Sequence, residues 1–205
     1  MNQRIQSPVF WGSYSPLGTL VGAGLLVMAS SRLAFAVFCA GALLWVYCLS
    51  ALAFFAAKSI MPKRGKTIIL LFLLGLVSSI YVLFGFLLNP LLTLSTWFFL
   101  VLIPPICIGS GIFEDLEGLE LDESIPRVFL EALSLALLII ALSLIREPLG
   151  MGSLSFPGGP GGIVEFFSAD NGEGFFPIRI LSVSSGGLLL LGYMVALFRH
   201  YREGK

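Results

Sequence analysis

Two uninterrupted apolar runs constrain this chain more than any other feature of its sequence. Residues 33–57 and residues 67–88 contain no charged side chain, and each run is longer than the roughly 20 residues that a helix needs to cross a bilayer. Only 12% of the chain is charged, against about 25% in soluble domains. A surface so poor in charge would aggregate in water, so the sequence predicts an integral membrane protein.

Six apolar segments follow one another along the 205 residues. We expect an all-α integral membrane protein with six transmembrane segments in a single polytopic domain, residues 1–205. The expected spans are residues 16–29, 33–57, 67–88, 91–112, 126–145 and 178–198. The first is short and glycine-rich. The fourth contains Pro104 and Pro105, which should kink or break it because proline lacks the amide donor of a helix.

A weak internal repeat relates the two halves of the chain. The tripeptide SPL at residues 15–17 opens the first segment, and NPL at residues 89–91 opens the fourth. Two longer segments follow each of them, so the halves would have opposite orientations in the membrane. The sequence thus predicts two inverted three-segment repeats, and short or broken segments at matching places often mark a binding site near the bilayer midplane.

Basic residues indicate the orientation of the chain. They lie in the connection after the second segment (Lys58, Lys63, Arg64, Lys66) and in the tail (Arg199, Arg202, Lys205). The positive-inside rule places these parts, and with them both termini, in the cytoplasm. The glycine- and proline-rich loop 146–177 is then external and is expected to be irregular. The acidic connection 114–123 is then cytoplasmic, either as a cation-attracting pore mouth or as a solvated loop.

Cys107 is the first candidate site residue, since it follows the double proline in PPICIGSG. Lipid does not tolerate the backbone groups that a broken helix exposes unless protein or a cofactor covers them, and a thiolate here could ligate iron. The alternative is an inert buried cysteine, which the local sequence alone favours. Cys39 and Cys48 fall on opposite faces of one predicted helix, so we interpret both as packing residues.

Arg146 and Glu147 end the predicted fifth span. An arginine in this place favours the negative end of its helix or extends to the membrane interface. His200 lies in the basic tail and is expected to be solvated. The sequence contains no Ser/His/Asp set, HExxH motif or paired carboxylates, so nothing in it indicates hydrolytic chemistry.

Residues 90–154 resemble the E subunit of the Rnf electron-transport complex and, equally, the D subunit of the sodium-pumping NADH:quinone reductase, Nqr. Members of that family carry a motif like NCIILGRAEAF, and this chain has ICIGSGIFEDL, which places the shared residues at Cys107, Gly111 and Glu114. A second, more specific motif resembles SIREILGNGTLFG. Here it reads LIREPLGMGSLSF and includes Arg146 and Glu147.

The resemblance implies a membrane subunit of a complex that couples electron transfer to Na⁺ or H⁺ translocation across the bacterial cytoplasmic membrane. The subunit would not be catalytic alone. It would pair with a homologous six-span sister of inverted topology, of the Rnf A or Nqr E type, and with other subunits of the complex. Each sister would supply two cysteines, one from each broken segment, to a shared [2Fe-2S] cluster, and Cys107 takes one ligand position.

The chain departs from the family at the other ligand position. The family's first segment resembles NPVLVQLLGLCPLLA, and the corresponding SPLGTLVGAGLLVMA places Leu25 where the cysteine belongs. Leucine cannot ligate iron, so this chain supplies at most one of the two expected thiolates. Either the cluster is held differently or the cofactor is lost. The alternative function is a non-redox membrane scaffold or a small-solute transport subunit on the same inverted-repeat fold.

Overall fold

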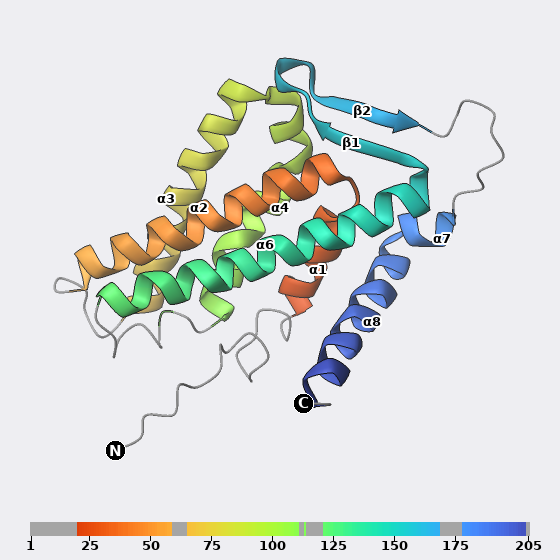
Figure 1. Cartoon of the computed structure of the whole chain (residues 1–205). Coiled ribbons are helices and arrows are strands. Elements are labelled where there is room, and N and C mark those ends of the chain that lie inside the picture. The colour runs from red at the N-terminus through yellow and green to blue at the C-terminus, as the bar shows by residue number, and fades with distance from the viewer. Residues whose placement is uncertain (1–19, 59–64, 111–112, 114–120, 169–177, 204–205) are drawn as a thin grey trace.

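The computed structural model describes residues 20–58, 65–110, 113, 121–168 and 178–203. The protein is mostly helical (Figure 1). Four helices are long and apolar enough to cross a membrane: α2 (Leu33–Ala57), α3 (Lys66–Leu88), α4 (Pro90–Gly109) and the span Ser124–Met151 of α6 (Leu121–Met151). These helices correspond to the second, third, fourth and fifth predicted segments.

The first and last predicted segments differ from long spanning helices. Within the described residues, α1 covers Leu20–Ala29, which is about 15 Å of helix, or half of the hydrocarbon thickness of a bilayer. The last segment is divided at Val183, where an extended backbone separates α7 (Arg179–Ser182) from α8 (Ser184–Glu203). The six-span layout and the inverted repeat therefore stay predictions.

Helix α2 is the centre of the bundle and packs against α3, α4 and α6. It runs antiparallel beside α6 (Figure 1). Since lipid tails are as apolar as leucine, burial in a membrane gives little drive for helices to associate, and small residues and polar contacts take that role. Gly85 of α3 lies so close to Phe38 and Thr93 that a Cβ would be 2.7 Å from each side chain.

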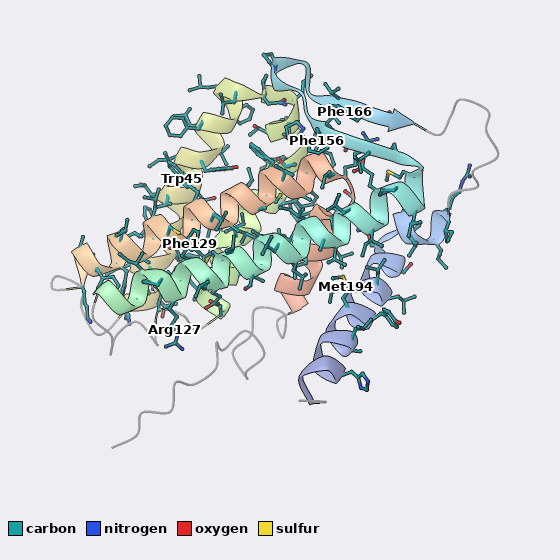
Figure 2. The ribbon with its side chains drawn as sticks, viewed as in Figure 1. Trp45, Arg127, Phe129, Phe156, Phe166 and Met194 are labelled. Carbon is teal, nitrogen blue, oxygen red and sulfur yellow. The ribbon has the colours of Figure 1, made fainter. Side chains whose placement is uncertain are left out.

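Aromatic rings fill the contact between α2 and α3. Trp45 of α2 has ring-centroid distances of 6.2 Å to Tyr81 and 5.9 Å to Phe84 of α3 (Figure 2). The Tyr81 hydroxyl donates a 2.9 Å hydrogen bond to the carbonyl of Phe38. A hydroxyl bonded in this way satisfies its polar group inside the bundle, where no water is present to do so.

Helix α4 continues through Pro104 and Pro105 instead of ending there. Pro104 cannot donate to the carbonyl of Leu100, because it has no amide proton. The hydroxyl of Ser78, on α3, donates a 3.2 Å hydrogen bond to that carbonyl. A neighbouring helix thus replaces one of the two missing donors. Of the predicted kink or break, the break is wrong, since the helix runs on to Gly109.

A hairpin follows α6, which corrects the expectation of an irregular loop and adds two short strands to a mostly helical fold. Strands β1 (Ser153–Pro157) and β2 (Ile163–Ser168) pair antiparallel, with Phe156 opposite Val164. The 3₁₀ turn η4 (Gly159–Gly161) joins them, so the PGGPGG run that predicted irregularity forms the turn of a hairpin. The rings of Phe156 and Phe166 lie together on it, 5.6 Å apart (Figure 2).

Asn89 fixes both the start of α4 and the position of the hairpin. Its side-chain oxygen accepts a 3.0 Å hydrogen bond from the Leu92 amide, and its side-chain nitrogen donates a 2.7 Å hydrogen bond to the carbonyl of Gly162. Gly162 has a φ of +93°, a backbone conformation that favours glycine. The hairpin is therefore held at the end of the bundle where α3 and α4 meet (Figure 1).

Candidate functional site

Cys107 lies in the last turn of α4 and is fully buried, with an exposed fraction of 0%. The phenol of Tyr47, on α2, faces Cys107 and Ser110, although its hydroxyl has no hydrogen bond of normal geometry within the described residues. The Ser110 hydroxyl donates a 2.8 Å hydrogen bond to the backbone carbonyl of Cys107. The thiol is thus enclosed by the chain's own side chains.

Leu25 lies on α1 and belongs to the same hydrophobic core as Cys107. Its exposed fraction is 1%, and α1 packs against α4. The two special segments of the sequence, the short first one and the proline-containing fourth one, are therefore brought together. Their residues at the two family positions are a leucine and a cysteine, and both are packed.

The described residues do not by themselves form a complete iron–sulfur site, and Cys107 is the one described cysteine at a family ligand position. Such a cluster takes four ligands, usually cysteine thiolates, and the described part of the chain has no group of three or more His, Cys, Asp or Glu side chains that could hold a metal ion. Cys39 is also fully buried and Cys48 is half-buried, in keeping with packing roles. Gly111 and Glu114, the other residues of this motif, lie outside the described residues.

Arg146 is buried inside α6, with an exposed fraction of 2%. Its guanidinium donates to the carbonyl of Leu181 at 2.7 Å and to that of Ser182 at 2.9 Å. It also donates to the carbonyl of Val27 and, at 3.1 Å, to the hydroxyl of Ser30. Val27 is in the last turn of α1, and Leu181 and Ser182 end α7, so the arginine bonds the carbonyl ends of two other helices.

Glu147 is fully buried beside the start of α2. One carboxylate oxygen accepts a 2.6 Å hydrogen bond from the backbone amide of Leu33, the first residue of α2. The other oxygen has no hydrogen-bond partner among the described residues. Ser155, on β1, accepts a weaker 3.5 Å contact from the amide of Ala34. Side chains distant in sequence thus cap α2, because its N-cap residue Arg32 makes no side-chain cap.

The consecutive residues Arg146 and Glu147 bond the two sides of the short connection between α1 and α2. Only residues 30–32 separate the end of α1 from the start of α2. A helix carries partial negative charge at its C-terminus and partial positive charge at its N-terminus. Arg146 supplies the positive charge that the end of α1 favours, and Glu147 supplies the negative charge that the start of α2 favours.

This arrangement corrects one prediction about Arg146 and Glu147. They do not end the fifth span, since α6 continues to Met151, and the arginine neither extends to the interface nor caps its own helix. The sequence also gave no prediction for Ser155 or for Gly187. A Cβ on Gly187 would lie 2.9 Å from the Arg146 guanidinium carbon, so this glycine allows α8 to approach the arginine.

Comparisons of this chain with protein families, with curated proteins and with solved structures yield no match.

Proposed function

We propose that this chain is a membrane subunit of an Rnf- or Nqr-type complex, which couples electron transfer to the movement of Na⁺ or H⁺. We assign it a structural role there, in which Cys107 and the other described residues ligate no cluster. The observation that carries the proposal is the packing of α1 against α4, with Leu25 and Cys107 buried in one core. These are the two segments that the resemblance singles out.

Arg146 and Glu147 give independent support, because they belong to the more specific of the two family motifs. Charged residues inside a membrane segment are costly and mark a function or a necessary structural contact. Here both are buried and bond three other helices, α1, α2 and α7. The chain thus has a buried polar connection among four helices, although a leucine, Leu25, stands at one of the two ligand positions.

We further propose that the subunit lies in the bacterial cytoplasmic membrane with both termini in the cytoplasm. Lys58 and Lys66 flank the connection between α2 and α3 at one end of the bundle, and the hairpin lies at the opposite end (Figure 1). Reporter fusions after Lys205 and within η4 should report opposite sides of the membrane. Reporters on the same side would contradict the six-span arrangement.

The decisive experiment is co-purification combined with iron analysis. The tagged chain, expressed with its genomic neighbours, should be isolated in detergent with a homologous six-span sister subunit. Iron in that complex should be equal in the wild type, in Cys107→Ser and in the matched control Cys39→Ser, since both thiols are enclosed. Loss of iron in Cys107→Ser alone would show that Cys107 is a ligand and that the structural role is wrong.

The same preparation tests the alternative function. Recovery of the chain only as a stable monomer, although its neighbours are expressed, would contradict membership of an Rnf- or Nqr-type complex. It would favour the non-redox scaffold or the small-solute transport subunit on the same fold.

A further inference from the structure

Two buried oxygen atoms on α6 have no hydrogen-bond partner among the described residues. They are the hydroxyl oxygen of Ser143 and one carboxylate oxygen of Glu147, Oε1. Both side chains have an exposed fraction of 0%. A buried polar group without a partner destabilises a fold, and native proteins contain few of them. Two such atoms on one helix therefore indicate that a further group binds there.

Ser143 and Glu147 lie on the same face of α6, one helical turn apart. Residues at positions i and i+4 of a helix have Cβ atoms about 5–6 Å apart. A water molecule that lies about 2.8 Å from each of two oxygens joins oxygens that are up to about 5.6 Å apart. The spacing of the two side chains therefore suits a bridge through one ligand of the size of water.

The two side chains also have complementary hydrogen-bonding needs. The Ser143 hydroxyl has a proton to donate, and Oε1 of Glu147 can only accept. The other carboxylate oxygen already accepts a 2.6 Å hydrogen bond from the amide of Leu33, which fixes the carboxylate beside the start of α2. A water molecule accepts from the hydroxyl and donates to Oε1, so it satisfies both groups at once.

The surroundings of Glu147 favour a neutral ligand over a metal cation. The start of α2, whose Leu33 amide donates to the carboxylate, carries partial positive charge. Ca²⁺ and Mg²⁺ take about six or more oxygen ligands, whereas this place offers two oxygens without partners. In the part of the chain that the structure describes, no group of three or more His, Cys, Asp or Glu side chains could hold a metal ion.

We propose that one ordered water molecule binds between Ser143 and Glu147. It accepts a hydrogen bond from the Ser143 hydroxyl and donates one to Oε1 of Glu147. The water thereby completes the contact by which Glu147 caps α2, since a continuous chain of hydrogen bonds then runs from the Leu33 amide to Ser143. Protein and not lipid surrounds this site, which allows water inside a membrane bundle. The site does not depend on electron transfer or on a partner subunit.

The sign of the effect of Ser143→Ala distinguishes a bound water from an unpaired hydroxyl. If the water is bound, the substitution removes one of its partners and should raise the unfolding equilibrium constant of the full chain in mixed micelles about fivefold. If the hydroxyl has no partner, the substitution should lower that constant, because it removes an unsatisfied polar group.

Ser134→Ala is the matched control on the same helix. The Ser134 hydroxyl donates a 2.7 Å hydrogen bond to the carbonyl of Glu131 within α6, so its removal involves no bridging ligand and should not raise the unfolding constant. The effect of Ser143→Ala should also disappear in a Glu147→Ala background, where the water has lost its acceptor. An equal effect in both backgrounds would contradict the bridge.

A crystal structure of the wild-type chain grown in a lipid phase gives a second measurement, which does not require any variant to fold. At a resolution that shows water molecules, we expect a density peak about 2.5–3.0 Å from both Oγ of Ser143 and Oε1 of Glu147. Unfolding of the wild type should be the same in sodium chloride and in choline chloride.

Three results would overturn the proposal. A Ser143→Ala variant that is as stable as the wild type, or more stable, would show that no water is held there. A direct hydrogen bond between Ser143 and Glu147, with no density peak between them, would replace the bridge. A peak closer than hydrogen-bond distance, together with greater stability in sodium chloride than in choline chloride, would assign the site to Na⁺.

Discussion

The carboxylate of Glu147 accepts a 2.6 Å hydrogen bond from the backbone amide of Leu33, 114 residues earlier in the chain. The amide is one of the unpaired donors at the start of a helix, and Glu147 satisfies it from α6. This contact, together with the bonds of Arg146, means that α6 positions α1 and α2 through two consecutive charged residues. Its removal should be measurable as a loss of stability.

Glu147→Ala should lower the free energy of unfolding by about 1–3 kcal/mol, because it leaves the buried amide of Leu33 without its acceptor. Glu147→Gln should lose less, since its side-chain oxygen can still accept from Leu33. The measurement is equilibrium unfolding of the full chain in mixed micelles. Glu165→Gln is the control, because its carboxylate forms a 3.6 Å ion pair with Arg32 that is 44% exposed on the acid's side, and exposed pairs contribute little.

Arg146→Lys should also destabilise the protein, although it keeps the positive charge. The guanidinium is planar and bonds four acceptors on α1, α7 and the turn after α1, whereas an ammonium is a compact charge with three donors. Each buried carbonyl left without a donor costs about 1–3 kcal/mol. Arg32→Lys, at a partly exposed position, should change stability by less than about 0.5 kcal/mol. Equal effects of the two substitutions would show that the bonds of Arg146 contribute nothing.

Two substitutions of Asn89 distinguish its capping of α4 from its anchoring of the hairpin. Asn89→Asp keeps the acceptor for the Leu92 amide but loses the donor to Gly162. We expect amide exchange to quicken in β1 and β2 while α4 is unaffected. Asn89→Ala removes both bonds and should additionally destabilise α4 by about 1 kcal/mol. Hydrogen exchange read by mass spectrometry distinguishes the two, and identical profiles for both variants would contradict the anchoring role.

The spanning helices were predictable because their signal is local. The apolar run 33–57 predicts α2 with the same bounds as in the structure. A run of twenty or more apolar residues crosses lipid as a helix, because a helix pairs all of its backbone groups internally. The fifth segment was predicted too short. Charged residues such as Arg146 and Glu147 normally indicate the end of a membrane span, whereas α6 continues to Met151. Their charges are tolerated inside α6 only because α1, α2 and α7 supply partners, and no local pattern shows such contacts.

The candidate site was less predictable than the helices. The sequence marked Cys107 and Leu25 as a pair, and the structure places both in one core. The local sequence favoured a buried cysteine at position 107, but it did not indicate that Tyr47 encloses the thiol, because that contact depends on how α2 packs on α4. The hairpin was missed for a related reason, since the alternating apolar residues of β1 and β2 are few and the glycines between them dominate the pattern.

Gly187 provides the most specific test of how α8 joins the bundle. A Cβ there would lie 2.8 Å from Val27 and 2.9 Å from the guanidinium carbon of Arg146, closer than van der Waals contact allows. Gly187→Ala should therefore cost about 1–3 kcal/mol through overpacking, even though alanine favours a helix over glycine by about 1 kcal/mol. Gly192, on the same helix, has open space at its Cβ position.

Gly192→Ala should accordingly stabilise the protein by up to about 1 kcal/mol, because helix propensity acts there without a clash. Opposite signs for two identical substitutions on α8 would follow only if its first turns are packed against Arg146 as described. The readout is the unfolding midpoint of the full chain in one detergent, with hydrogen exchange of α7 and α8 alongside. A stabilising Gly187→Ala would mean that α8 does not approach Arg146, and the contact between these helices would have to be redrawn.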